Sequence, residues 1–195
     1  MAIRYYDEAI VDKINKWFTS SKIKVIKPNE TNRFFEMTAH TSKDKITLPL
    51  ISISRDTSFS LLQNKKTSLS YNGVKLNSDK LTNKVSQLNA IPILITYQID
   101  IFTQFFEDGD NLLRELIFNL VNKPTIKITI PYNGTDYEHI ASIKLNSQIT
   151  DNSDVDLKLF PDQFTRWTIV FEIQDAYLFS IPYNKTWKIE ADLDE

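Results

Sequence analysis

The chain of 195 residues carries a formal net charge of −2, with 42% apolar residues, 25% charged residues and no cysteine. Its length suits one domain with a sizeable core. The near-neutral charge offers no electrostatic footprint for nucleic acid or an anionic membrane. The absence of cysteine excludes disulfide scaffolds, thiol nucleophiles and cysteine-ligated zinc.

Targeting segments and nucleotide loops are also missing from the sequence. The first residues, MAIRYYDEAIVDKINKWF, lack the apolar core of a secretory signal, and the apolar runs are far shorter than the roughly 20 residues that cross a bilayer. The three glycines, Gly73, Gly109 and Gly134, are far apart. P-loop and Rossmann sites need clustered glycines and are therefore excluded. We expect a soluble protein made in a cytoplasm, without membrane contact or cofactor.

The first ninety residues predict a helix, short strands and a projection. Residues 4–19 form an amphipathic helix by their apolar spacing. Short extended segments follow, and Pro49 within ITLPLISISRD predicts an edge strand or a bulge. Residues 57–90 are polar and turn-rich, and their YNGV favours a type I′ turn, so we expect a projecting loop or hairpin.

From residue 95 onward, apolar residues alternate with polar ones and predict strands. In ITYQIDIFT one face carries Ile95, Tyr97, Ile99 and Ile101, and the other carries Thr96, Gln98, Asp100 and Phe102. The same period continues in TIKITI, ASIKL, RWTIVFEIQ and, more weakly, TWKIEA. A second helix is predicted at about residues 110–122, with Asp110 as its N-cap.

These elements predict an α+β fold in which a mostly antiparallel twisted β-sheet has one face covered by the two helices. We expect residues 1–195 to form a single domain. The acidic residues 190–195 are predicted to be a mobile tail.

The sequence offers few groups for catalysis. His40 and His139 are the only histidines, and His139 in YEHIAS is predicted to be a surface or hydrogen-bonded strand residue. The acidic stretch DNSDVDLKLFPD lacks the sixth-position glycine and twelfth-position glutamate of an EF-hand loop. We therefore expect no catalytic, cofactor or metal site.

One enzymatic alternative stays open. PDQFTRWTIVFEIQ echoes the metal-dependent nuclease pattern in which Asp162 and Glu172 would hold the metal and a lysine would polarise the attacking water. In this chain the lysine position is Gln174, which cannot supply that charge.

The end of the strand at residues 95–103 has a surplus of aromatic residues. Phe102, Phe105 and Phe106 crowd this corner, and Phe118 falls on the polar side of the second helix. For Phe118 we expect a second internal neighbour, such as the N-terminal helix, with a partner subunit as the alternative. The surplus indicates assembly, and we predict that Phe105, Phe106 and Phe118 lie at or near subunit contacts. Phe102 and Tyr71 complete the candidate interface.

The stretch ITYQIDIFTQFFEDGDNLLRELIFNLVNKPTIKITIPYN resembles the tail-completion or tail-terminator proteins of tailed bacteriophages. In that family a strand of YxIDIYT type leads into an LLRELxFxL helix and then into a strand ending near IPY. The later DNSDVD and RWTIVFEIQDAYLF are similar to the strand that follows. Residues 91–182 carry the resemblance.

The resemblance implies a structural virion protein, not an enzyme, made in the host bacterial cytoplasm and located in the tail or neck. It would form a sixfold ring at the head-proximal end of the tail, stop tube polymerisation and dock the head connector. Its partners would be further copies of itself, the tail tube and sheath proteins, and the head–tail connector or neck proteins. Another neck adaptor, or a baseplate or tube-initiation protein, is the alternative within this class.

Overall fold

The computed structural model describes residues 3–18, 23–32, 47–62, 90–132, 135–153 and 164–179. This part of the chain contains helices α1 (Ile3–Trp17) and α3 (Phe106–Asn122) and a seven-stranded sheet. The strands are β1 (Lys24–Ile26), β2 (Leu50–Arg55), β3 (Ser60–Leu61), β4 (Ala90–Thr103), β5 (Thr125–Tyr132), β6 (Thr135–Asp151) and β7 (Thr165–Phe179).

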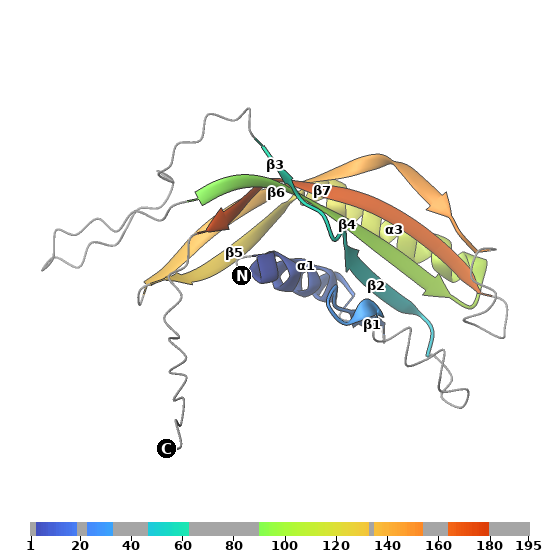
Figure 1. Cartoon of the computed structure of the whole chain (residues 1–195). Coiled ribbons are helices and arrows are strands. Elements are labelled where there is room, and N and C mark those ends of the chain that lie inside the picture. Colours follow the sequence, from blue (N-terminus) through green and yellow to red (C-terminus); the bar gives the residue numbers. More distant parts are fainter. Residues whose placement is uncertain are drawn as a thin grey trace, which may run out of the picture.

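The sheet follows the order β1-β2-β4-β7-β6-β5, with β3 paired to β4 at Ile93 and Leu94. Every pairing is antiparallel except that of β1 with β2. The long strand β6 pairs with β5 along its first half and with β7 along its second half. Figure 1 shows the long strands arching over α1. The predicted α+β class with a mostly antiparallel sheet is confirmed.

One face of the sheet and both helices share a single core. The alternation in β4 and β7 places every second side chain inward, where all seven are fully buried: Ile95, Tyr97, Ile99, Ile101, Ile169, Phe171 and Ile173. Tyr97 lies opposite Phe171 in the register and stacks on it, with 5.5 Å between ring centroids. The apolar stripes of the two helices join this cluster through Tyr6, Ile10 and Ile14 of α1 and Leu113, Leu116 and Leu120 of α3.

The other face of the sheet is partly buried as well, which the alternation does not predict. Phe102 and Leu50 are opposite each other on β4 and β2, and they form a second cluster with Ile26 and Phe164. Next to them Asp100 is only 5% exposed. This end of the outer face is covered because Phe164, far along the sequence, packs over it at 6.1 Å from Phe102 between ring centroids.

The second helix begins earlier than predicted, and Asp110 is not its N-cap. The helix starts at Phe106, and the extended residue before it, Phe105, makes no side-chain capping hydrogen bond. Glu107 and Asp108 in the first turn complement the positive end of the helix dipole instead. The early start depends on Gly109, because a Cβ there would lie 2.9 Å from Thr103 Oγ1.

The structure revises two expectations for the first half of the chain, and other expected segments lie outside the described residues. Pro49 follows a cis peptide bond and precedes β2, which lies between β1 and β4 and is not an edge strand. Residues 60–61 of the predicted loop form the short strand β3. The rest of that loop from residue 63 to 89, the tail at 190–195 and the strand expected in TWKIEA lie outside the described residues.

We expect Gly109→Ala to destabilise the protein by about 1–2 kcal/mol, although alanine ordinarily stabilises a helix interior by about 0.5–1 kcal/mol over glycine. The new methyl group would meet Thr103 Oγ1 at 2.9 Å and the Trp167 ring at 3.2 Å. Thr103 is buried, so it cannot move aside freely. Urea unfolding measures the change, with Glu115→Ala on the exposed side of α3 as the matched control. A more stable Gly109→Ala variant would contradict this packing.

Candidate interaction surface

Large apolar side chains are exposed along α3 and in the turn before it. Phe105 is 62% exposed, Phe106 57%, Phe118 62% and Val121 60%. They are exposed because the opposite stripe of the helix, centred on Leu116, packs into the core. Phe106 leans against Trp167, with 5.8 Å between ring centroids, so its position is partly fixed. We define these four residues as the α3 surface.

Three of the residues proposed from the sequence, Phe118, Phe102 and Tyr71, do not all lie where they were expected. The internal neighbour expected for Phe118 is wrong within the described chain, since this side chain is largely exposed. Phe102 is only 2% exposed, because the second apolar cluster encloses it, and it is removed from the candidate surface. Tyr71 lies outside the described residues.

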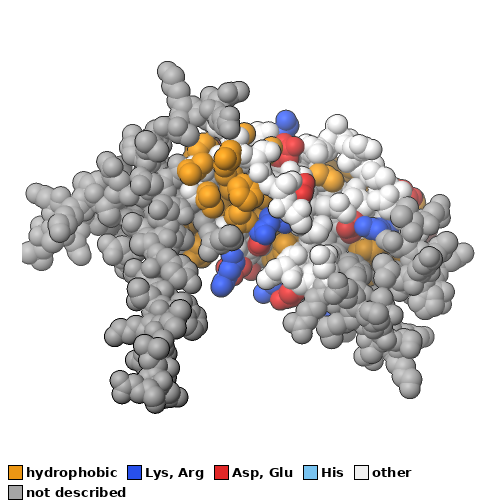
Figure 2. Space-filling view, in the orientation of Figure 1, with side chains coloured by type: hydrophobic (Ala, Val, Ile, Leu, Met, Phe, Trp, Pro, Cys, Tyr) orange, Lys and Arg blue, Asp and Glu red, His pale blue; other side chains and the backbone are white. Residues whose placement is uncertain are grey.

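A second exposed apolar area lies at the opposite end of β4. Phe59, Leu61 and Ile91 are 44%, 53% and 46% exposed. They come together because β3 pairs with the start of β4, while the α3 surface follows the end of β4. Figure 2 shows hydrophobic side chains gathered on this side of the molecule. Sequence patterns missed this area because Phe59 and Leu61 fall in the segment that was expected to be a loop, and Ile91 precedes the strand pattern that begins at residue 95.

A buried carboxylate is fully paired on the outer face of the sheet. Asp100 Oδ1 accepts hydrogen bonds from Thr168 Oγ1 at 2.6 Å and from Arg166 Nε at 3.2 Å. Gln98 Nε2 donates to the other carboxylate oxygen at 2.9 Å. Arg166 also lies over the ring of Phe102, 5.4 Å from its centroid. Thr168 and Arg166 belong to β7 and Gln98 to β4 itself, so the bonds to Oδ1 place Asp100 to hold β4 and β7 together.

A partly buried carboxylate anchors α1 to the sheet. Asp7 accepts hydrogen bonds of 2.7 Å from the Tyr97 hydroxyl and from Arg55 Nη1. Burial raises the pKa of Asp7, although both donors oppose the rise, and burial also raises the pKa of Tyr97. These contacts link α1 to β2 and β4 across more than forty residues of sequence.

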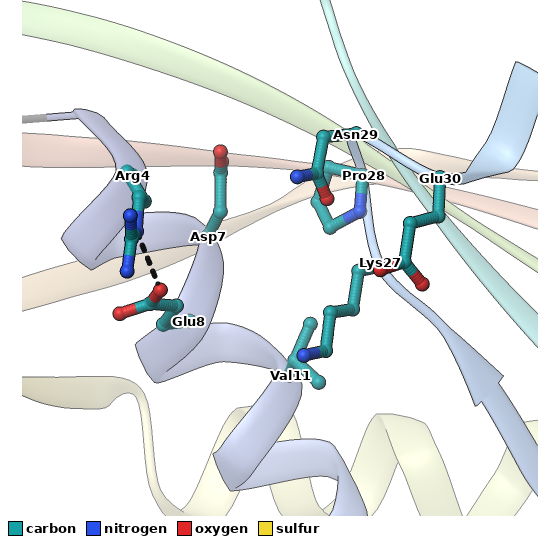
Figure 3. Close-up of a pocket in the computed structure, with 8 residues that line it drawn as sticks. All are labelled: Arg4, Asp7, Glu8, Val11, Lys27, Pro28, Asn29 and Glu30. Carbon is teal, nitrogen blue, oxygen red and sulfur yellow. Dashed lines mark hydrogen bonds and ion pairs between the residues drawn. The ribbon is translucent and has the colours of Figure 1, made fainter. Parts of the chain in front are cut away.

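The crevice beside Asp7 is too small for most organic ligands. Its volume is about 170 Å³, against roughly 300–1,000 Å³ for small-molecule sites. Figure 3 shows its walls, formed by α1 residues such as Arg4 and Glu8 and by the segment after β1, including Lys27 and Glu30. Arg4 and Glu8 bind each other at 2.7 Å across one helical turn. Charges of both signs line the crevice, so it favours no particular ion.

His139 is buried and hydrogen-bonded, as one of the two expectations for it stated. It is 3% exposed, and its Nε2 lies 2.7 Å from the Asp175 carbonyl oxygen. A carbonyl can only accept, so this nitrogen carries the proton and donates. The ring meets Tyr6 and Tyr177 edge-on, 6.2 and 5.3 Å between centroids. Burial lowers the pKa of His139, although the Asp175 carbonyl opposes the shift.

The residues of the nuclease alternative are not brought together in the described chain. Glu172 lies on the outer face of β7, opposite Lys144 of β6 and Thr96 of β4. Asp162 falls outside the described residues. Within the residues that are described, no three His, Cys, Asp or Glu side chains form a group that could hold a metal ion. Neither described helix is long and apolar enough to span a membrane.

We expect Arg166→Met to cost about 2–3 kcal/mol of stability, because it leaves Asp100 buried with an uncompensated charge. Adding Asp100→Asn should recover much of that loss, since the amide needs no cation. Lys127→Met is the matched control: it breaks an exposed pair with Glu138 and should change stability by less than about 1 kcal/mol. Chemical denaturation measures all four proteins. Equal losses in the single and double variants would contradict the pairing.

Stability should fall as the pH drops below about 6.5, the ordinary pKa of histidine. The folded state holds His139 with a lowered pKa, so the unfolded state binds more protons between the folded pKa and that value. His139→Gln should flatten the dependence, as measured by thermal unfolding from pH 7.5 to 5. His40→Gln removes the other histidine and serves as the control. Flattening in the control alone would contradict the assignment.

Comparison with known proteins assigns no role to these residues. No family model matches the chain, and no curated protein is similar to it in sequence. The candidate surface therefore rests on geometry: exposed apolar side chains on α3 at one end of β4, and a second exposed group where β3 meets the other end.

Proposed function

We propose that this chain is a structural protein of a bacteriophage tail. It forms a ring at the head-proximal end of the tail, where it ends the tube and docks the head connector. The observation that supports this proposal is the exposure of Phe105, Phe106 and Phe118, which the sequence had singled out as surplus to one small domain. The same segment carries the resemblance to tail-completion proteins.

Exposure of one aromatic residue would carry little weight, since single exposed apolar side chains are common. Here four large apolar residues follow one helix and its preceding turn. They form two exposed apolar pairs, Phe105 with Phe106 and Phe118 with Val121, and groups of this kind are typical of protein–protein contacts. The second exposed area, at Phe59, Leu61 and Ile91, lies at the other end of β4. Exposed apolar surfaces of different composition on one subunit suit the head-to-tail contacts from which rings are built.

The first test is to locate the chain in purified particles. Proteomics of density-purified tails should find it at about one ring per particle, far below the tube protein, and imaging should place it at the head-proximal end. A position at the baseplate would favour a tube-initiation role instead. Absence from particles would overturn the proposal and would justify a Mg²⁺-dependent nuclease assay with Glu172→Ala.

Purified wild-type protein should assemble into rings, and Phe105→Ser with Phe118→Ser should weaken assembly by about tenfold or more. Each fully buried phenylalanine contributes roughly 1.5–3 kcal/mol, and about 1.4 kcal/mol corresponds to a factor of ten. Light scattering and negative-stain imaging report the fraction in rings. Ile149→Ser, which truncates a 41% exposed residue of β6, is the matched control. Unchanged assembly in the double variant would exclude the α3 surface from the subunit contact.

A further inference from the structure

We propose that the two ends of α3 are the two halves of one subunit contact, in which the acidic first turn of one copy docks onto a lysine cluster beside the last turn of the next copy. This inference rests on the proposed ring. It adds the partner, a second copy of this chain, and the residues that select it.

The N-terminal end of α3 is both apolar and acidic. Phe105 and Phe106 are exposed, and Glu107, Asp108 and Asp110 follow immediately, all of them exposed. Asp110 has a cation of its own within reach, since Arg114 Nη2 lies 3.7 Å from its carboxylate. Glu107 and Asp108 therefore provide the main negative charge beside the two rings. We call these four residues, Phe105 to Asp108, the acidic end.

The C-terminal end of α3 is both apolar and basic. Phe118 and Val121 are exposed on the last turns, and Lys123 follows the helix. Lys13 and Lys16, one helical turn apart near the end of α1, lie close to Lys123. Burial lowers the pKa of Lys13, and the charges of Lys123 and Lys16 add to the shift. Lys13 Nζ donates to the carbonyl of Thr125 at 2.7 Å, which fixes it beside the start of β5. We call this group the basic end.

The geometry makes the two ends complementary between copies and not within one copy. A helix rises about 1.5 Å per residue, so the 17 residues of α3 hold the two ends roughly 25 Å apart. One end presents aromatic rings with carboxylates, and the other presents apolar side chains with ammonium groups. A contact between unlike surfaces is heterologous, and it forms a ring where the rotation between neighbouring copies closes and an open filament where it does not. The net charge of −2 is small, so the separation of charge along α3 decides the orientation.

The test uses two charge-reversed variants of the full chain. Glu107→Lys with Asp108→Lys makes both ends positive, and Lys16→Glu with Lys123→Glu makes both ends negative. Each variant alone should self-associate about tenfold more weakly than wild type or worse, because like charges then face each other. An equimolar mixture should restore assembly, since every contact again joins opposite charges. Native mass spectrometry should show the two variants in equal numbers within the restored assemblies.

Two further measurements keep the test decisive. Circular dichroism and thermal unfolding must show that each variant is folded, and the recovery in the mixture cannot arise from misfolded chains. Lys144→Glu with Lys127→Glu, on β6 and β5, reverses the same amount of charge elsewhere and should leave assembly unchanged. Wild-type assembly should also weaken as salt is raised, since the Debye length is about 8 Å at physiological ionic strength and shortens further as salt is added.

The outcomes separate this inference from the ring itself. If wild type forms rings and both variants assemble equally well, the contact lies elsewhere and only this inference is overturned. If the variants assemble normally but bind purified tails more weakly, the ends of α3 contact another tail protein and the inference is likewise overturned. If wild type stays monomeric at high concentration and does not join particles, the proposed function fails together with it.

Discussion

The pairing of β4 with β7 is the constraint on which the rest of the structure depends. Their register faces Tyr97 to Phe171 and Ile99 to Ile169, so the inward side chains of both strands form one continuous apolar floor. A slip of one residue would turn that floor outward and would also separate Asp100 from Thr168. Burial on one face and a satisfied carboxylate on the other therefore select the same register.

The two helices are attached to this floor in different ways. Polar anchors supplement the apolar stripe of α1: Asp7 bonds Tyr97, and the Tyr6 hydroxyl accepts the backbone N–H of Tyr177 at 2.7 Å. The start of α3 depends instead on close approach, which the missing side chain of Gly109 permits. The buried stripe of α3 also packs into the core, so the helix is fixed along its length and its outer side faces away from the sheet. Rigidity reduces the ordering cost of a subunit contact.

Magnitudes explain why the exposed aromatic residues and the charges belong together in the proposed ring. Association costs an estimated 4–15 kcal/mol in lost freedom, and a fully buried phenylalanine returns roughly 1.5–3 kcal/mol. A few partly buried rings therefore do no more than roughly offset this cost, and they give no orientation, since apolar contact is non-directional. The acidic and basic ends of α3 would supply the orientation. On this view Phe105, Phe106 and Phe118 provide affinity, and the charges select which surfaces meet.

The sequence by itself determined the features that repeat locally. Period two from Ile95 to Ile101 identified the buried face of β4, helical spacing identified α1, and the aromatic surplus singled out Phe105 and Phe106, which are exposed. For Phe118 the sequence favoured an internal neighbour, and the structure exposes this side chain instead. Only the tertiary structure decided the fate of Phe102, the partners of Asp100 and the start of α3. The physical reason is that a side chain on the outer face of a strand is buried only if another segment packs over it. For Phe102 that segment contains Phe164, about sixty residues away in the sequence. Hydrophobic periodicity shows on which face of a strand a residue lies, but only the tertiary structure decides whether another segment packs over that face.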